Sequence, residues 1–427
     1  FFLSPEKVIR IISASSYFFL LFAYKNILKF ISKKIKLIYF ILLLSNPLVW
    51  FYGHKIYVDL FSFSLGIYGF SLVILGSKNK YFFYLTFFLL SFSVLLKPFN
   101  LILIFAILFY FYFFSKKISS YDLLFNFFFP ILVLICFIIL NKYFFDFYII
   151  PEKFINDGSI LIKLDKINFS FFYLIISNFI YYIGYLGIIL FPLLFLFIKK
   201  INFLIFYRFI LIFFLSIILS QLISSNYGEI NLGPIQKYVQ LNFYKFIISF
   251  NFILILYLIF NLRKLNISNP ELNKIYFIIY IITIYILCIC FLKLSQRYLL
   301  LILPFSYSII LLLRYSSLIY AFNLILNSII IFLLLLNYNM QSTLSKEITE
   351  YLFKNNIIYK THPGSFLPHL MHEYQDIQNF KKNSSMHFDS SILYKISDIE
   401  PIGVNFKTFE YKILGKIIKK IYLLSVN

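Results

Sequence analysis

Charged residues and the helix-breaking residues Gly and Pro are scarce in this chain. Only 13% of its 427 residues are charged, and Gly and Pro number 12 each. A soluble domain is about a quarter charged, because a folded globule must cover its surface with polar groups. The shortage of charge therefore excludes a chain built only of water-soluble domains.

Cysteines and acids are also few. Cys136, Cys288 and Cys290 are the only cysteines and lie inside apolar runs, so neither a disulfide framework nor a CxxC metal site is predicted. Asp and Glu total 17 against 39 Lys and Arg, a net charge of +22. This excess does not predict a nucleic-acid partner, because most of the lysines lie at the ends of apolar runs, where they orient helices against a membrane.

What the chain has in abundance is long apolar runs. Hydrophobic residues make up 61% of it, and a helix that crosses the hydrocarbon core needs about 20 of them in a row. We therefore predict an all-α polytopic membrane protein with about twelve transmembrane helices. The predicted spans are 11–28, 36–52, 59–76, 81–96, 99–114, 121–141, 169–198, 203–224, 246–262, 274–293, 298–313 and 317–337.

Two kinds of loop alternate between these spans. One set is rich in Lys and Arg, which predicts the cytoplasmic side, and the other holds the acids, as in 142–168 and 225–245. This alternation of loops places residues 1–10 on the extracytoplasmic side. The chain begins with Phe1 rather than Met. We expect a fragment whose first transmembrane helix and first outer loop are absent.

The composition changes near residue 338. Residues 1–337 are predicted to form the transmembrane domain. Residues 338–427 have ordinary soluble composition, with apolar residues at helical spacing followed by short β-like runs. We predict a small extracytoplasmic α/β domain there.

Asp59 is the first candidate for chemistry. It follows Asn46, Pro47 and Gly53 at the outer end of two apolar spans. An ionisable group so close to hydrocarbon is energetically costly, and its presence there therefore indicates a function. The alternatives are capping of the 59–76 helix or pairing with Lys55. Two further segments lie at the outer ends of predicted helices, and each contains a candidate cation. The segment from Ser91 to Pro98 contains Lys97, and the segment from Gln296 to Pro304 contains Arg297.

Taken together and in order, these segments resemble the C-type (GT-C) membrane glycosyltransferases. That superfamily includes the protein O-mannosyltransferases and the lipid A aminoarabinose transferases. The resemblance covers residues 1 to about 337. It implies transfer of a sugar from a polyprenyl-phosphate donor to a glycan, lipid or protein acceptor. The transfer would take place on the extracytoplasmic face of a cell-envelope membrane, the inner or plasma membrane of a bacterium.

The resemblance also implies roles for residues. Asp59 matches an acid that orients the acceptor or holds a divalent metal ion, Mg or Mn, and is the candidate catalytic residue. Arg297 would clamp the donor phosphate with two hydrogen bonds, and Lys97 would add a point charge beside it. Snorkelling and interfacial anchoring are the alternative interpretations of these two cations.

Weaker candidates surround this set. His54 is a candidate for the acceptor or metal shell, although a lone interfacial histidine is more often only hydrogen-bonded. Glu229 and Lys237, in an outer loop, are candidates to line the acceptor groove or to be merely solvated. The histidines of the C-terminal domain have no paired acid or cysteine and favour a surface interpretation.

Two other classes stay open. A polymerase or ligase of lipid-linked oligosaccharides concentrates Arg and His in one large loop between spans, whereas the largest outer segment here is C-terminal. A transporter or flippase of lipid-linked glycans predicts paired broken helices in two halves, which the sequence does not show.

Overall fold

The computed structural model describes most of the chain as helix. Two compact units are distinguished, one with the helices up to Ile331 and one from Phe332 onward. The described residues are 5–31, 35–54, 59–76, 80–114, 119–145, 169–191, 193, 205–223, 241–261, 269–292, 294–311, 317–355, 361–362, 394–397, 406–413 and 416–425.

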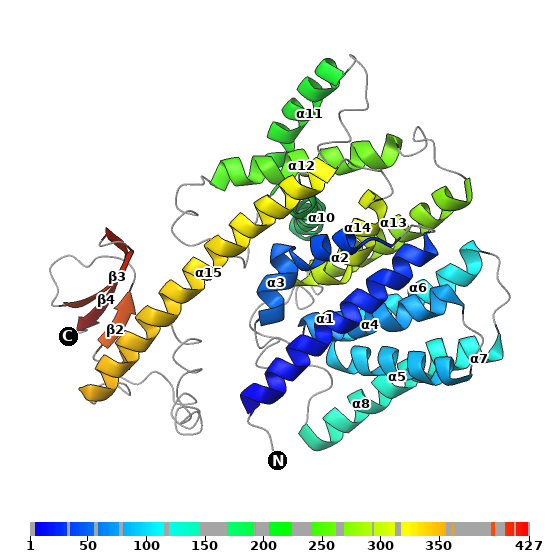
Figure 1. Ribbon diagram of the computed structural model, residues 1–427, viewed down its shortest axis with the longest axis horizontal. Helices are drawn as coiled ribbons and strands as arrows, with labels where there is room; N and C mark the ends of the chain where they lie inside the picture. Colours follow the sequence, from blue (N-terminus) through cyan, green and yellow to red (C-terminus); the bar gives the residue numbers. More distant parts are fainter. Residues whose placement is uncertain are drawn as a thin grey trace. The chain divides into compact units, whose positions relative to one another are not determined.

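The first four helices form around a break at Asn46 and Pro47. They are α1 (Pro5–Phe30), α2 (Leu37–Leu44), α3 (Pro47–His54) and α4 (Asp59–Leu75), and α1 packs along α4 (Figure 1). One span was predicted over 36–52, whereas the structure divides this segment into two short helices, so a single continuous span is not confirmed. Pro47 has no N–H to continue α2, and the Asn46 side chain instead accepts a hydrogen bond from the Leu48 N–H, which starts a new helix.

The next helices are interrupted in the same way. They are α5 (Lys80–Leu96), the 3₁₀ turn η1 (Pro98–Asn100), α6 (Leu101–Phe113), α7 (Ser120–Leu123), the π-helical turn η2 (Leu124–Phe128) and α8 (Phe129–Phe145). Proline at position 98 disfavours helical backbone at Lys97, whose φ of −147° and ψ of 106° are extended. This interruption places Lys97 at a corner between α5 and α6.

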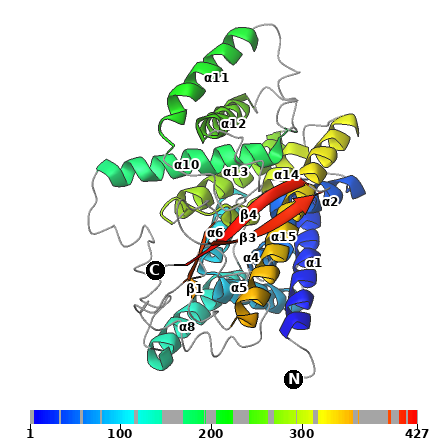
Figure 2. The ribbon, with the colours of Figure 1, turned by 90° about the vertical axis from the view of Figure 1, so that its left-hand side faces the viewer.

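The remaining helices of the first unit include two that approach closely. The elements are α10 (Phe169–Leu190), α11 (Ile205–Ser220), α12 (Leu241–Asn261), α13 (Asn269–Ile289), the 3₁₀ turn η7 (Gln296–Leu301), α14 (Leu303–Leu311) and the start of α15 (Ser317–Lys354). A Cβ at Gly184 of α10 would meet the carbonyl oxygen of Ile248 in α12. Small residues permit such backbone contact between membrane helices, and Figure 2 shows α10 beside α12.

Six of the described helices are long and apolar enough to cross a membrane. They are Arg10–Phe30, Ser120–Phe144, Phe171–Leu190, Leu241–Phe260, Asn269–Ile289 and Leu318–Leu352. Large apolar side chains such as Phe18, Phe243 and Phe322 are exposed along these helices, as lipid contact requires. The structure therefore indicates an α-helical membrane protein, but the count of about twelve spans is not confirmed, because several predicted spans are shorter or broken here.

The second unit joins the end of α15 to a small sheet. Its strands are β1 (Thr361–His362), β2 (Tyr394–Ser397), β3 (Phe406–Ile413) and β4 (Lys416–Ser425), in the order β1-β2-β4-β3, with β3 and β4 antiparallel. Met340, Leu344, Ile348 and Leu352, four residues apart on one helix face, pack against Phe409, Ile421 and Leu423 of the sheet.

This arrangement refines the sequence expectation. The helical spacing after residue 338 was predicted to begin a separate domain, whereas α15 continues without a break from Ser317 to Lys354. The sequence between 337 and 344 contains no Gly or Pro to end a helix. Helix and sheet agree with the expected α/β composition, and the extracytoplasmic side stays a prediction.

Candidate functional site

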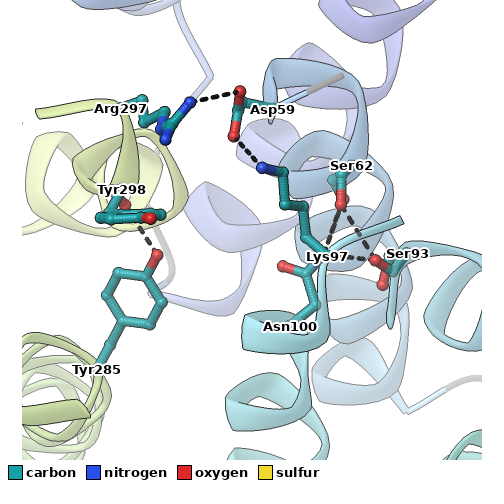
Figure 3. A network of polar contacts seen from close by, with 8 residues as sticks. All are labelled: Asp59, Ser62, Ser93, Lys97, Asn100, Tyr285, Arg297 and Tyr298. Carbon is teal, nitrogen blue, oxygen red and sulfur yellow. Dashed lines mark hydrogen bonds and ion pairs between the residues drawn. The ribbon is translucent and has the colours of Figure 1, made fainter. Parts of the chain in front are cut away.

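Asp59 lies almost completely buried between two cations. It is the first residue of α4, where a negative charge suits the helix dipole, and its side chain is 1% exposed. The Lys97 Nζ is 2.8 Å from Asp59 Oδ1, and the Arg297 Nη1 is 4.0 Å from Asp59 Oδ2 (Figure 3). Three segments that are far apart in the sequence thus supply one ion cluster.

A buried amide network holds the Lys97 corner in place. Asn100 Nδ2 donates to the Ser62 carbonyl oxygen at 3.2 Å, to Ser62 Oγ at 2.8 Å and to the Ser93 carbonyl oxygen at 2.9 Å. Ser62 Oγ in turn donates to the Ser93 carbonyl oxygen at 3.0 Å. These bonds tie η1 to α4 and α5, so the corner that carries Lys97 is fixed to the helix that begins with Asp59 (Figure 3).

Close helix packing supports the same corner. A Cβ at Gly66, one turn along α4 from Ser62, would lie 3.1 Å from Ser93 Oγ and 3.2 Å from Asn100 Cγ. A larger residue at position 66 would push these side chains away. The glycine therefore lets α4 approach α5 and η1 closely enough for the amide network to form.

Tyrosines anchor the segment that carries Arg297. The Ser295 N–H donates to Tyr182 Oη at 3.0 Å, and the Tyr285 hydroxyl donates to the Tyr298 carbonyl oxygen at 2.9 Å. Gln296 Nε2 also donates to Tyr181 Oη at 2.8 Å. Side chains of α10 and α13 thus hold both ends of the short turn in which Arg297 lies.

The cluster presents positive charge to whatever reaches it. Two cations face one carboxylate, which leaves the three residues with one net positive charge. The Lys97 and Arg297 side chains are 22% and 29% exposed, against 1% for Asp59. The two cations are therefore more accessible to an approaching ligand than the acid that lies between them.

The structure places some of the predicted site residues and leaves others undescribed. Asp59, Lys97 and Arg297 come together, and their chemical roles stay predictions. His54 is the last residue of α3, and its side chain lies outside the described residues, as do Glu229 and Lys237.

Sequence reasoning missed the residues that support the cluster. Asn100, Ser62 and Ser93 are buried polar residues in apolar helices, and Tyr182 and Tyr285 are two of 36 tyrosines. A buried polar residue in a membrane segment is itself a signal. Asn100, two residues after the Pro98 break, could have been singled out on that ground.

The donor set of this cluster does not suit a resident divalent metal. Mg²⁺ and Mn²⁺ prefer several oxygen ligands, but Asp59 is the one carboxylate that forms the described ion cluster, and both its oxygens face cations. Among the described residues no group of three His, Cys, Asp or Glu side chains gathers to hold a metal. The predicted metal would need ligands from elsewhere in the chain.

Comparisons with family models, with curated proteins and with solved structures find no match for this chain. The GT-C resemblance therefore rests on the sequence segments themselves, and the geometry of the cluster has to be interpreted on its own chemistry.

Proposed function

We propose that this protein is an integral membrane glycosyltransferase. In this proposal it moves a sugar from a polyprenyl-phosphate donor to a glycan, lipid or protein acceptor on the extracytoplasmic face. The observation that carries the proposal is the ion cluster, in which Lys97 and Arg297 lie at helix ends on either side of the buried Asp59. The short motifs that resemble GT-C enzymes contain these same three residues.

The chemistry needs cations where a phosphate leaves. The acceptor oxygen forms a bond to the anomeric carbon of the sugar, and the bond from that carbon to the phosphate oxygen breaks. The bonding electrons stay on the phosphate, which changes from a singly charged diester to a monoester with nearly two negative charges. The proton of the acceptor hydroxyl passes to a base on the acceptor side.

Lys97 and Arg297 are suited to this change in charge. Fixed positive groups that face a developing negative charge lower the barrier, because they need no reorganisation at the moment of reaction. The Asn100 network and the tyrosine-held turn fix the segments that carry the two cations. Asp59, with both oxygens directed at cations, is proposed to orient them rather than to take the proton of the acceptor.

The test uses membranes that contain the protein and a polyprenyl phosphate carrying a radiolabelled hexose. We expect the label to leave the lipid, and we expect Asp59→Asn and Arg297→Ala each to slow this loss at least about tenfold, which is 1.4 kcal/mol of activation free energy. Lys29→Gln is the matched control, because Lys29 is an exposed lysine in the last turn of α1.

Two results would contradict the proposal. Full activity in both variants would show that the cluster takes no part in transfer. Label that crosses the membrane while still attached to its lipid would instead identify a transporter or flippase.

A further inference from the structure

The accessible and buried sides of the ion cluster differ in charge. Lys97 and Arg297 are partly exposed, whereas Asp59, which lies between them, is almost fully enclosed. An anion that binds at the exposed side has to share both cations with a carboxylate that it cannot displace into solvent. The carboxylate also repels the anion, and a buried site screens this repulsion less than bulk water does.

From this geometry we infer that Asp59 is a built-in counter-ion that weakens the binding of phosphate monoesters at Lys97 and Arg297. The inference rests on the proposed function and gives Asp59 a role other than acid–base chemistry or metal binding. Asp59 is then a positioning residue that also sets the affinity of the site.

The net charge of the cluster matches the charge of the lipid donor better than that of the product. The cluster has one net positive charge, which neutralises a phosphodiester with one negative charge. The polyprenyl phosphate left after sugar transfer has nearly two, so part of its charge stays uncompensated while Asp59 is ionised. The counter-ion therefore limits how tightly the spent lipid phosphate is held, and the spent lipid can leave.

The inference predicts opposite effects for removing the acid and removing a cation. Asp59→Asn keeps the size of the side chain and an oxygen atom at its end, but it raises the net charge of the cluster to two. We expect this variant to bind a phosphate monoester about tenfold more tightly. Lys97→Gln and Arg297→Gln should each bind it about tenfold more weakly, and tenfold corresponds to 1.4 kcal/mol.

The experiment measures the Kd of farnesyl phosphate for the purified protein in detergent micelles, with farnesyl methyl phosphate as the singly charged diester. Tightening in Asp59→Asn should be larger for the monoester than for the diester. The double variant Asp59→Asn with Lys97→Gln restores one net positive charge and should bind the monoester more weakly than Asp59→Asn alone. Lys29→Gln, which changes the charge far from the cluster in the sequence, should leave both constants unchanged.

The possible failures are distinguishable. If the two glutamine variants weaken binding but Asp59→Asn leaves it equal or weaker, the counter-ion inference is wrong and the proposed phosphate site survives. If neither glutamine variant changes binding, the phosphate site and the proposed function both fail. Should Asp59→Asn not fold, Asp59→Ser provides the same comparison, with the fluorescence of Trp50 in the adjoining helix α3 as the check on folding.

Discussion

Removing the charges of Lys97 and Asp59 together should destabilise the helix bundle less than the sum of the two separate changes. Lys97→Met keeps most of the aliphatic stem but leaves the buried Asp59 with Arg297, 4.0 Å away, as its remaining partner in the cluster. With an effective dielectric constant of about 20, a pair of charges at 2.8 Å attracts by roughly 6 kcal/mol and a pair at 4.0 Å by roughly 4 kcal/mol. Desolvation offsets much of this attraction.

The net effect is smaller than the attraction itself. Loss of one partner from a buried pair costs about 3–5 kcal/mol, and the 22% exposure of Lys97 brings this down to about 2–3 kcal/mol of unfolding free energy. In the double variant Asp59→Asn with Lys97→Met, no carboxylate is left without its partner. The double variant should therefore cost less than the sum of the two single variants, with a coupling free energy of about 1–3 kcal/mol.

The measurement is unfolding by SDS titration in mixed micelles, followed by the fluorescence of Trp50, the one tryptophan in the chain. Trp50 lies in α3, which packs against both α4 and η7. Lys36→Met removes an exposed lysine and should change the midpoint little. Costs that add to within about 0.5 kcal/mol would refute the reasoning, since independent sites behave in that way.

Three other predictions follow from the packing and the charge pattern. Asn100→Leu removes the hydrogen bonds to Ser62 and Ser93, so it should lower the free energy of unfolding by about 1–3 kcal/mol. It should also raise the KM for the lipid donor more than it lowers kcat. An unchanged KM would show that the network does not position Lys97. Gly184→Ala should cost about 1–3 kcal/mol in the same SDS titration, because the added methyl group meets the Ile248 backbone, and a neutral result would mean that α10 and α12 separate without penalty. Cysteines introduced at positions 117 and 380, which lie outside the described residues, test the sidedness in a cysteine-free variant: a membrane-impermeant maleimide should label 380 and not 117 from outside, and the reverse pattern would overturn the orientation.

Local sequence determined the membrane character of this protein and the ends of many helices. Partition into lipid depends on the summed hydropathy of a short segment, so runs such as 121–141 and 246–262 could be recognised without knowing their neighbours. The helix ends at Asp59 and Lys97 could be predicted for the same reason. An acid favours the start of a helix at its own position, and Pro98 disfavours helical backbone at the residue before it. Asn46-Pro47 was equally visible, but it was interpreted as part of one span because the flanking residues are apolar.

Only the tertiary structure decided which helix ends meet. Nothing within a few residues of Asp59 or Lys97 specifies Arg297, which is 238 positions from the first and 200 from the second in the sequence. Their meeting depends on the close approach at Gly66, on the amide of Asn100 and on the tyrosines that hold the 295–298 turn. The burial of Asp59 between two accessible cations likewise appears only when the helices are assembled, because exposure depends on what the other segments cover rather than on the residue itself.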